Sequence, residues 1–322
     1  MNASHQITMV SLEELVSQNH QYRKFKELFN FKSIEAELLS IETTANYKGY
    51  GVVRLFKCLL LQFMEDMSDR ELERYIADSN AGKWFCDFGL SEPTPDHSVF
   101  SKMRKKIGTK LLSKIFAIFR DQLRQAGYMS EVFTFVDATH LISKANLWEE
   151  RDEARKKKFE KLNNEVLPKV ASDKQARIGC KGGSKFWYGY KKHVSVDIQS
   201  GMINKVAVTP ANLTDAQGMK LVLPGQGAVY ADRGYCTKPS RIAAAAKNVH
   251  LCAVKKNNMQ GKIFDLDKYY TKIRTPFERV FAQDNKRVRY AGIAKNQFAT
   301  FMNPICFNLR RLIVIAPPIL SP

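Results

Sequence analysis

The sequence predicts an α/β domain with a mixed β-sheet, preceded by an all-α N-terminal domain. Residues 1–128 carry apolar side chains at helical spacing. Two alternating segments, 193–199 and 203–210, flank Ser200-Gly201 and predict an antiparallel hairpin. Later strand-like runs alternate with helical stretches, which favours parallel strands, so the sheet is expected to contain both pairings.

The composition indicates a globular protein with a polyanionic partner. Its 322 residues include 51 Lys+Arg against 32 Asp+Glu, a formal charge of +19. Such an excess favours nucleic acid, because each phosphate contact releases condensed counterions. The six scattered cysteines form no Cys-x-x-Cys pair, which argues against a zinc module and suits a reducing cytosol. Without a signal peptide or an apolar run near the roughly 20 residues that span a bilayer, no membrane partner is expected.

The N-terminal domain is predicted to hold several helices in succession. Residues 52–64 are apolar at three- and four-residue spacing, and Ser68 with Glu71 has the form of a capping box that opens a second helix. Asp96 is placed to cap a third helix through Ile107, and another helix follows over 109–126. The third helix carries the basic side chains of Lys102, Arg104 and Lys105. A basic helix after a turn is one way to enter a major groove, but a solvated face of an ordinary helical domain explains the pattern equally well.

The second domain, predicted over 129–315, begins with a strand at 132–139. A basic insertion at about 141–191 follows; its charge run over 149–158 indicates an exposed helix, and its glycine-rich stretch over 179–185 indicates a flexible loop that could touch DNA. After the hairpin, the predicted elements are a helix at 214–222, a strand at 227–232, a helix at 239–247, a strand at 250–256 and a helix around 276–285. The prolines of the last residues, 316–322, exclude a helix there and predict an irregular tail.

Three carboxylates are placed to form one site. Asp137 is expected to end the first strand, Asp232 to end a later one, and Glu278 to lie one turn into the helix that Pro276 opens. Clustered carboxylates repel one another and need a cation, and oxygen-only ligands favour Mg²⁺ or Mn²⁺ over zinc. Two such ions would activate an attacking oxygen and stabilise the leaving oxygen at a phosphodiester.

Each acid alone has a simpler explanation. An aspartate at a strand end is more often a turn or helix cap, and Glu278 could form a surface pair with Arg274 at i, i+4. Two further acids compete: Asp197 is expected to face solvent, and Asp215 is explained by helix capping. The sequence contains no His-Glu-x-x-His, Gly-x-Ser-x-Gly or Gly-x-Gly-x-x-Gly motif that would favour another chemistry.

Four segments together resemble the successive signatures of DDE transposases from bacterial insertion sequences, the IS-five type in particular. They are VDATH (136–140), PANLTDA (210–216), YADRGY (230–235) and RTPFERVF (274–281). PDHSVFSKMRKKIG (95–108) is similar to the N-terminal domain of that group. The resemblance implies a ribonuclease-H-like catalytic fold in which Asp137, Asp232 and Glu278 bind the metal ions.

The resemblance also implies residues that contact DNA. Arg274 would belong to a Tyr-x-x-Arg-x-x-x-Glu-x6-Lys signature that grips DNA near the site. Thr271 stands at its tyrosine position and Asn285 at its lysine position, so Lys286, one residue late, takes the lysine role. Arg233 is expected to meet DNA or to pack.

The function that the resemblance implies is a Mg²⁺-dependent transposase of the bacterial cytoplasm and nucleoid. It would bind double-stranded DNA at the terminal inverted repeats, cleave the element ends and join their 3′-hydroxyl groups to target DNA, as a homodimer on paired ends. Two alternatives stay open. One is a non-catalytic copy that only occupies the repeats, and the other is a stand-alone nuclease of the same fold.

Overall fold

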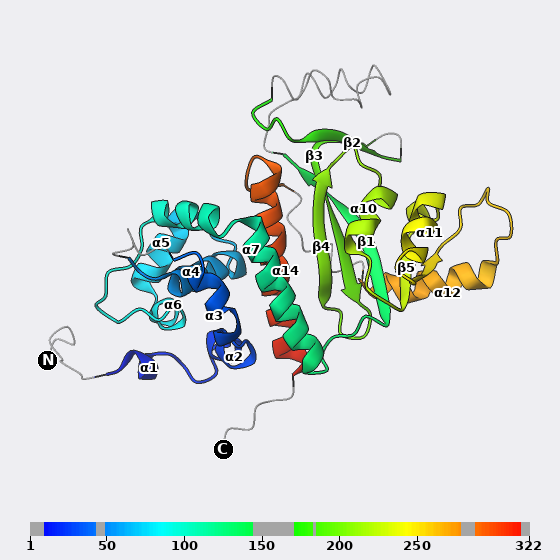
Figure 1. The fold of residues 1–322 in the computed structure, drawn as a ribbon. Coiled ribbons are helices and arrows are strands. Elements are labelled where there is room, and N and C mark those ends of the chain that lie inside the picture. Colours follow the sequence, from blue (N-terminus) through cyan, green and yellow to red (C-terminus); the bar gives the residue numbers. More distant parts are fainter. Residues whose placement is uncertain (1–9, 43–48, 144–170, 183–184, 278–286, 317–322) are drawn as a thin grey trace, which may run out of the picture. The chain divides into compact units, whose positions relative to one another are not determined.

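A computed structural model describes residues 10–42, 49–143, 171–182, 185–277 and 287–316 (Figure 1). By its internal contacts the chain divides into two compact units, Met1–Phe119 with Ile305–Pro322, and Arg120–Pro304. This division falls inside a helix, and the domain bounds 1–128 and 129–315 stay a prediction. The charge run over 149–158, Glu278, Lys286 and all of the tail after Ala316 lie outside the described residues.

The first unit is helical, as the periodicity predicts. Its helices are α1 (Leu12–Leu15), α2 (Gln21–Leu28), α3 (Lys32–Leu39), α4 (Val52–Met64), α5 (Asp69–Asp78), α6 (Asn80–Phe85) and the first part of α7 (His97–Gln125). The predicted capping box is present: the Ser68 side chain accepts from the Glu71 N–H, and the Glu71 side chain accepts from the Ser68 N–H. Helix α4 buries apolar side chains on nearly all sides, which explains its nearly continuous apolar sequence.

Helix α7 combines the two helices that the sequence predicts on either side of Gly108. Asp96 caps its start, since Asp96 Oδ1 accepts from the Ser98 N–H at 2.7 Å. Gly108 interrupts it with a φ of 62°, in the left-handed region that favours glycine. The interruption is a kink within one long element, so the two predicted helices are confirmed.

The second unit is built on a mixed sheet (Figure 1). Its strands are β1 (Phe133–Ile142), β2 (Arg177–Lys181), β3 (Lys185–Asp197), β4 (Ile203–Pro210), β5 (Ala228–Ala231) and β6 (His250–Ala253). They lie in the order β2-β3-β1-β5-β6, and β4 also pairs with β3. β3 is antiparallel to β1 and to β4, whereas β5 is parallel to β1 and β6 is parallel to β5. The predicted mixed sheet is confirmed.

Strands β1 and β3 are longer than the sequence predicts. β1 continues past Asp137 to Ile142, so the expectation that Asp137 ends the strand is wrong. The reason is that β3 starts at Lys185 and supplies antiparallel partners as far as Ile142, which is paired with Gly189. The expectation of a flexible loop over 179–185 is wrong for its first residues, because residues 179–181 lie in β2, and residues 183–184 lie outside the described residues. A Cβ on Gly179 would come within 2.6 Å of Trp187, so close packing explains that glycine.

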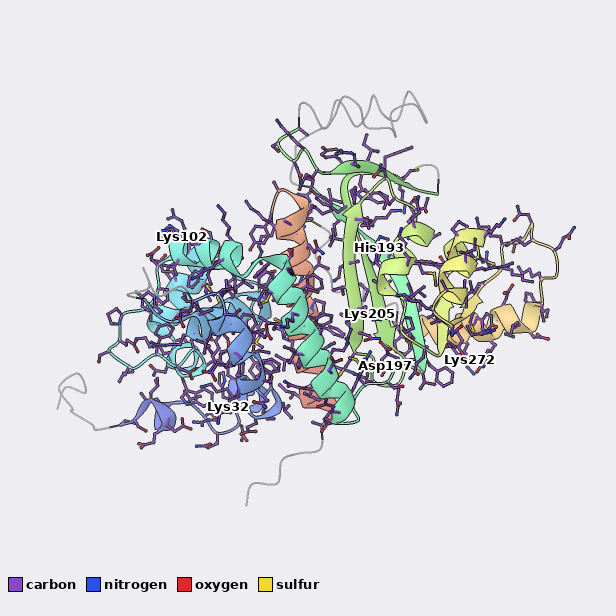
Figure 2. The ribbon with its side chains drawn as sticks, in the orientation of Figure 1. Lys32, Lys102, His193, Asp197, Lys205 and Lys272 are labelled. Carbon is purple, nitrogen blue, oxygen red and sulfur yellow. The ribbon has the colours of Figure 1, made fainter. Side chains whose placement is uncertain are left out.

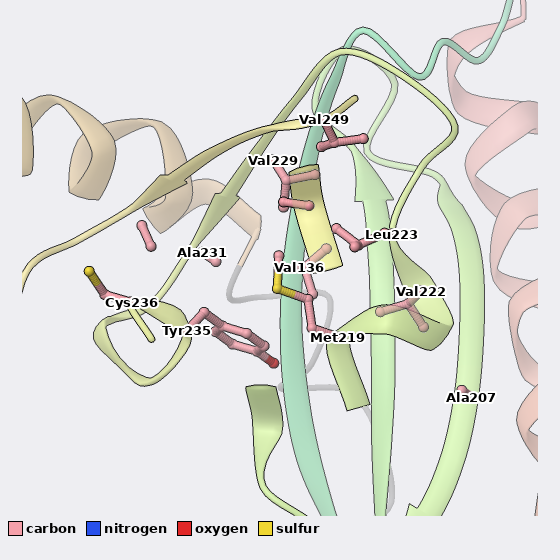
Figure 3. Packing of buried hydrophobic residues seen from close by; sticks show 12 residues of the cluster. Val136, Ala207, Met219, Val222, Leu223, Val229, Ala231, Tyr235, Cys236 and Val249 are labelled. Atoms are coloured by element: carbon pink, nitrogen blue, oxygen red, sulfur yellow. The ribbon is translucent and has the colours of Figure 1, made fainter. Parts of the chain in front are cut away.

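Helices α10 (Asp215–Val222) and α11 (Lys238–Ala245) follow β4 and β5, as predicted. A capping box between Thr214 and Gln217 starts α10, whose apolar side packs on the sheet. The resulting core contains Val136, Met219, Val222, Val229 and Tyr235 among its buried side chains (Figure 3). Strand β6 is shorter than predicted. Helix α12 (Phe264–Arg274) is not predicted from the sequence. The 3-10 turn η4 (Thr275–Phe277) lies at the start of the predicted helix around 276–285, and residues 278–286 lie outside the described residues.

The last helix, α14 (Ile293–Ile315), is 23 residues long and, by length and composition alone, apolar enough to cross a membrane. Of its most apolar window, 56% is buried inside the protein, as in a core helix. The sequence predicts an apolar helix before the tail, which α14 confirms, but not the length of that helix.

Candidate functional site

Asp137 lies in β1, and Asp232 directly follows the adjacent parallel strand β5. In the register of β1 and β5, Val136 lies opposite Ala231, the last residue of β5. Asp137 and Asp232 are the next residues along the chain. The sheet therefore brings together two acids that lie far apart in the chain, at the point where β5 ends and β1 continues.

The electrostatics of this pair favour a bound cation. Burial is the main cause that raises the pKa of Asp137 to about 6, and the negative charge of Asp232 raises it further. The Ala138 N–H, which donates to Asp137 Oδ1 at 2.8 Å, acts in the opposite direction. Two adjacent carboxylates, one of them largely withdrawn from water, are therefore a costly arrangement at neutral pH that a positive charge would relieve.

Asp232 has the capping role that the sequence leaves open, and its role as a metal ligand stays a prediction. It caps the 3-10 turn η3 (Arg233–Tyr235), since Asp232 Oδ1 accepts from the Arg233 N–H at 2.5 Å. The same oxygen lies 2.8 Å from Nη1 of Arg274, in an ion pair. The carboxylate is half exposed, so it is accessible to a ligand as well as to its partners in the chain.

Arg274, the last residue of α12, connects this helix to the acids. Its ion pair with Asp232 links segments 42 positions apart (274 − 232) and was not predicted, because the sequence suggested only a local pair with Glu278. The missed helix α12 is the reason, since it places Arg274 beside the end of β5.

The residues just before Glu278 are anchored against the strands that carry the two aspartates. The ring of Phe277 lies 6.2 Å from that of Phe135, two residues before Asp137 on β1. The ring of Tyr270 lies 5.7 Å from that of Tyr230 on β5, in an edge-to-face arrangement. The chain passes from this anchored segment directly into Glu278, which lies outside the described residues. Within the residues that the structure describes, no group of three or more acids, histidines or cysteines could hold a metal ion.

The residues after Asp232 divide between surface and core. Arg233 is exposed, whereas Tyr235 is 1% exposed and packs in the core beside Val136 and Met219 (Figure 3). Between them, Gly234 has no left-handed φ, and a Cβ there would come no closer than 3.9 Å to a neighbouring atom, Asp215 Oδ2, so neither the turn nor close packing requires glycine.

The two competing acids have structural partners. Asp197 is 1% exposed, not solvent-facing as predicted, because its Oδ2 accepts from the backbone and hydroxyl of Ser200 at 2.9 and 2.6 Å and holds the β3–β4 turn (Figure 2). Asp215 lies in the first turn of α10, where Thr214 rather than Asp215 is the cap. Its Oδ1 accepts from Lys191 Nζ at 2.9 Å, a pair that gave no signal in the sequence because Lys191 lies inside a predicted insertion.

The basic residues of the predicted third helix do not behave alike. Lys102 and Lys105 are exposed on α7 (Figure 2 labels Lys102). Arg104 instead pairs with both carboxylate oxygens of Asp69 at 2.8 and 2.5 Å and donates to Gln62 at 3.0 Å. The Arg104 side chain is 12% exposed and holds α5 to α7, so the structure gives it a packing role, and its contact with DNA stays a prediction.

Comparisons with known proteins identify the family of the chain. A family model described as a transposase domain (DUF772) matches residues 10–106, and one described as a transposase DDE domain matches residues 130–302. Among solved structures, the chain is similar to one in the cryo-EM structure of the piggyBac transposase synaptic complex with hairpin DNA. The identity is 9% and the TM-score is 0.41, with 94% of this chain and 77% of that chain covered. The DDE model alone covers more than half of the chain, and the protein belongs to the DDE transposases of insertion sequences.

Proposed function

We propose that Asp137, Asp232 and Glu278 together bind divalent cations, Mg²⁺ in the first place and Mn²⁺ as a substitute, and that this site cleaves insertion-sequence ends and joins them to target DNA. The observation that carries the proposal is the register of β1 and β5, which puts Asp137 and Asp232 side by side. The segment that leads into Glu278 is anchored to the same strands, through Phe277 and through Arg274.

The residues present fit a hard divalent cation. Both described acids offer only carboxylate oxygens, and the pKa of Asp137 is raised because burial outweighs the opposing effects of the Ala138 N–H, Lys181 and Arg274. Divalent ions held by such acids activate an attacking oxygen and stabilise the leaving oxygen at phosphorus. In this proposal the three acids position the scissile phosphodiester, first for attack by water at the element end and then for attack by the freed 3′-hydroxyl on target DNA.

The DNA contacts of the proposal come from exposed basic side chains. Lys102 and Lys105 on α7 would contact backbone phosphates of the terminal inverted repeat, and Arg233 would contact DNA beside the acids. Arg274 and Lys286 would hold the strand that reacts. The net charge of +19 supports tight, salt-dependent binding to double-stranded DNA. Assembly as a homodimer on paired ends, acting on the bacterial nucleoid, is proposed from family membership.

The test is divalent-ion-dependent cleavage of a labelled duplex that carries the inverted repeat flanking the gene. Wild type is expected to cut at the element end, whereas Asp137→Asn and Asp232→Asn are expected to retain binding to the duplex and not to cut it. Lys272→Gln, which removes an exposed charge from α12, is the matched control and is expected to cut normally.

Other outcomes separate the alternatives. Cutting by Asp232→Asn at the wild-type rate would remove this acid from the mechanism. Binding without cutting by wild type would favour the non-catalytic copy, and cutting without sequence preference or joined products would favour the stand-alone nuclease.

A further inference from the structure

The ion pair between Arg274 and Asp232 concerns the carboxylate that the proposed function assigns to a divalent cation. Arg274 Nη1 lies 2.8 Å from Asp232 Oδ1, and the two side chains are 17% and 51% exposed. Asp232 Oδ1 also accepts from the Arg233 N–H. A cation that binds at this oxygen therefore competes with a guanidinium that is already in contact with it.

Arginine is suited to exchange one anion for another. Its planar guanidinium binds carboxylate and phosphate with similar geometry, and it stays charged at every relevant pH. A phosphodiester bound beside Asp232 would therefore offer Arg274 an equivalent partner. In that exchange the cation takes over the neutralisation of Asp232 while the phosphate neutralises Arg274, so neither charge is left buried and unpaired.

We infer that Arg274 is an exchangeable counter-charge for Asp232, which passes from the carboxylate to a DNA phosphate when a divalent cation binds. This inference rests on the proposed function, since it requires that Asp232 bind the cation. The consequence is that DNA binding and cation binding are coupled. When a DNA phosphate binds Arg274, the guanidinium no longer competes for Asp232, so DNA raises the affinity for the cation. By linkage, the cation raises the affinity for DNA by the same factor.

The alternative is a fixed brace, in which Arg274 only fastens α12 to the end of β5. The aromatic contacts of the same segment, Tyr270 with Tyr230 and Phe277 with Phe135, already fasten it to both strands. A brace predicts that losing Arg274 changes stability and leaves the affinity for cations unchanged. The two roles therefore differ in a binding measurement that does not depend on catalysis.

The first test is a Mn²⁺ titration followed by electron paramagnetic resonance, on the full chain without DNA. Arg274→Gln is expected to bind Mn²⁺ about five-fold or more tightly than wild type, because the competing charge is gone. Lys272→Gln removes a positive charge from the same turn of the same helix without touching Asp232, and is expected to stay within about two-fold of wild type. Equal affinities of Arg274→Gln and wild type would contradict the exchange.

The second test repeats the titration with a saturating duplex that carries the flanking inverted repeat. Wild type is expected to bind Mn²⁺ about five-fold or more tightly with the duplex than without it, and Arg274→Gln to show no such gain. This measurement on wild type stands even where the variant does not fold.

The results also distinguish the inference from the proposed function. One outcome would contradict only the exchange: Asp232→Asn abolishes Mn²⁺ binding, but neither Arg274→Gln nor the duplex changes the Mn²⁺ affinity. Arg274 would then only hold α12 against the end of β5. Equal Mn²⁺ binding by wild type and Asp232→Asn would overturn the proposed cation site, and the exchange with it.

Discussion

Asparagine in place of Asp137 is expected to stabilise the protein at neutral pH while it abolishes cleavage. Burial, and then the charge of Asp232, raise the pKa of the Asp137 carboxyl from its ordinary 3.8 to about 6 in the folded protein. Each pH unit of such a difference corresponds to about 1.4 kcal/mol, so ionising Asp137 in the fold costs about 3 kcal/mol. Asparagine is nearly the same size and carries no charge, so it avoids this cost.

The sign and the pH window follow from proton binding. Between pH 3.8 and about 6 the folded protein keeps a proton on Asp137 that the unfolded chain has lost, so stability falls as the pH rises through this range. Wild type and Asp137→Asn are therefore expected to be equally stable near pH 3.5. At pH 7.5 the variant should be more stable by about 2–3 kcal/mol, with part of the 3 kcal/mol discounted because the side chain is not fully enclosed.

The assay is urea denaturation followed by circular dichroism in the presence of EDTA, at several pH values. Asp265→Asn, an exposed acid in the same unit, is the control and should change the unfolding free energy by less than about 1 kcal/mol. Added Mg²⁺ should stabilise wild type and not Asp137→Asn, since only wild type retains the full ligand set. An Asp137→Asn variant that is less stable than wild type at pH 7.5 in EDTA, or a difference that does not vary with pH, would refute this reasoning.

Three further predictions concern packing and DNA binding. Gly218→Ala should lower the unfolding free energy by about 2–4 kcal/mol, because the new Cβ would lie 2.0 Å from the buried ring of His193. Adding His193→Ala to this variant should recover part of the loss in denaturation experiments. An unfolding free energy that Gly218→Ala leaves unchanged would mean that α10 shifts freely. The buried Tyr235 hydroxyl has no hydrogen-bond partner among the described residues, so Tyr235→Phe should match wild type or exceed it in thermal stability. Tyr235→Ala should lose about 3–5 kcal/mol of unfolding free energy. A large loss of stability in Tyr235→Phe would reveal a hydrogen-bond partner. Arg104→Ala should lose about 1–3 kcal/mol of stability, because its hydrogen bonds to Asp69 on α5 are lost. Lys105→Ala should keep full stability and lower the salt dependence of DNA binding by about one phosphate contact. A salt dependence that Arg104→Ala lowers and Lys105→Ala does not would show that Arg104 faces DNA.

Elements with a local cause could be predicted from the sequence alone. The capping box of Ser68 and Glu71, the cap at Asp96 and the hairpin turn at Ser200-Gly201 each depend on residues a few positions apart, and all three are confirmed. The strands at 132–139 and 227–232 could also be predicted, because each contains a short, mostly apolar run of consecutive residues that leads to Asp137 or Asp232.

Errors arose wherever a partner from a distant segment decides the outcome. The length of β1 depends on β3, and the partner of Arg104 is Asp69 in another helix. None of these partners can be identified from periodicity or propensity, which report only on neighbours along the chain.

The order of the segments and the chemistry of the acids were therefore determined by the sequence, and their assembly by the tertiary structure. Only the parallel register of β1 and β5 puts Asp137 beside Asp232, and only the packing of α12 brings Arg274 to the same carboxylate. The physical reason is that pairing between strands and burial of charge are properties of the folded sheet, whereas caps and turns form from a few consecutive residues.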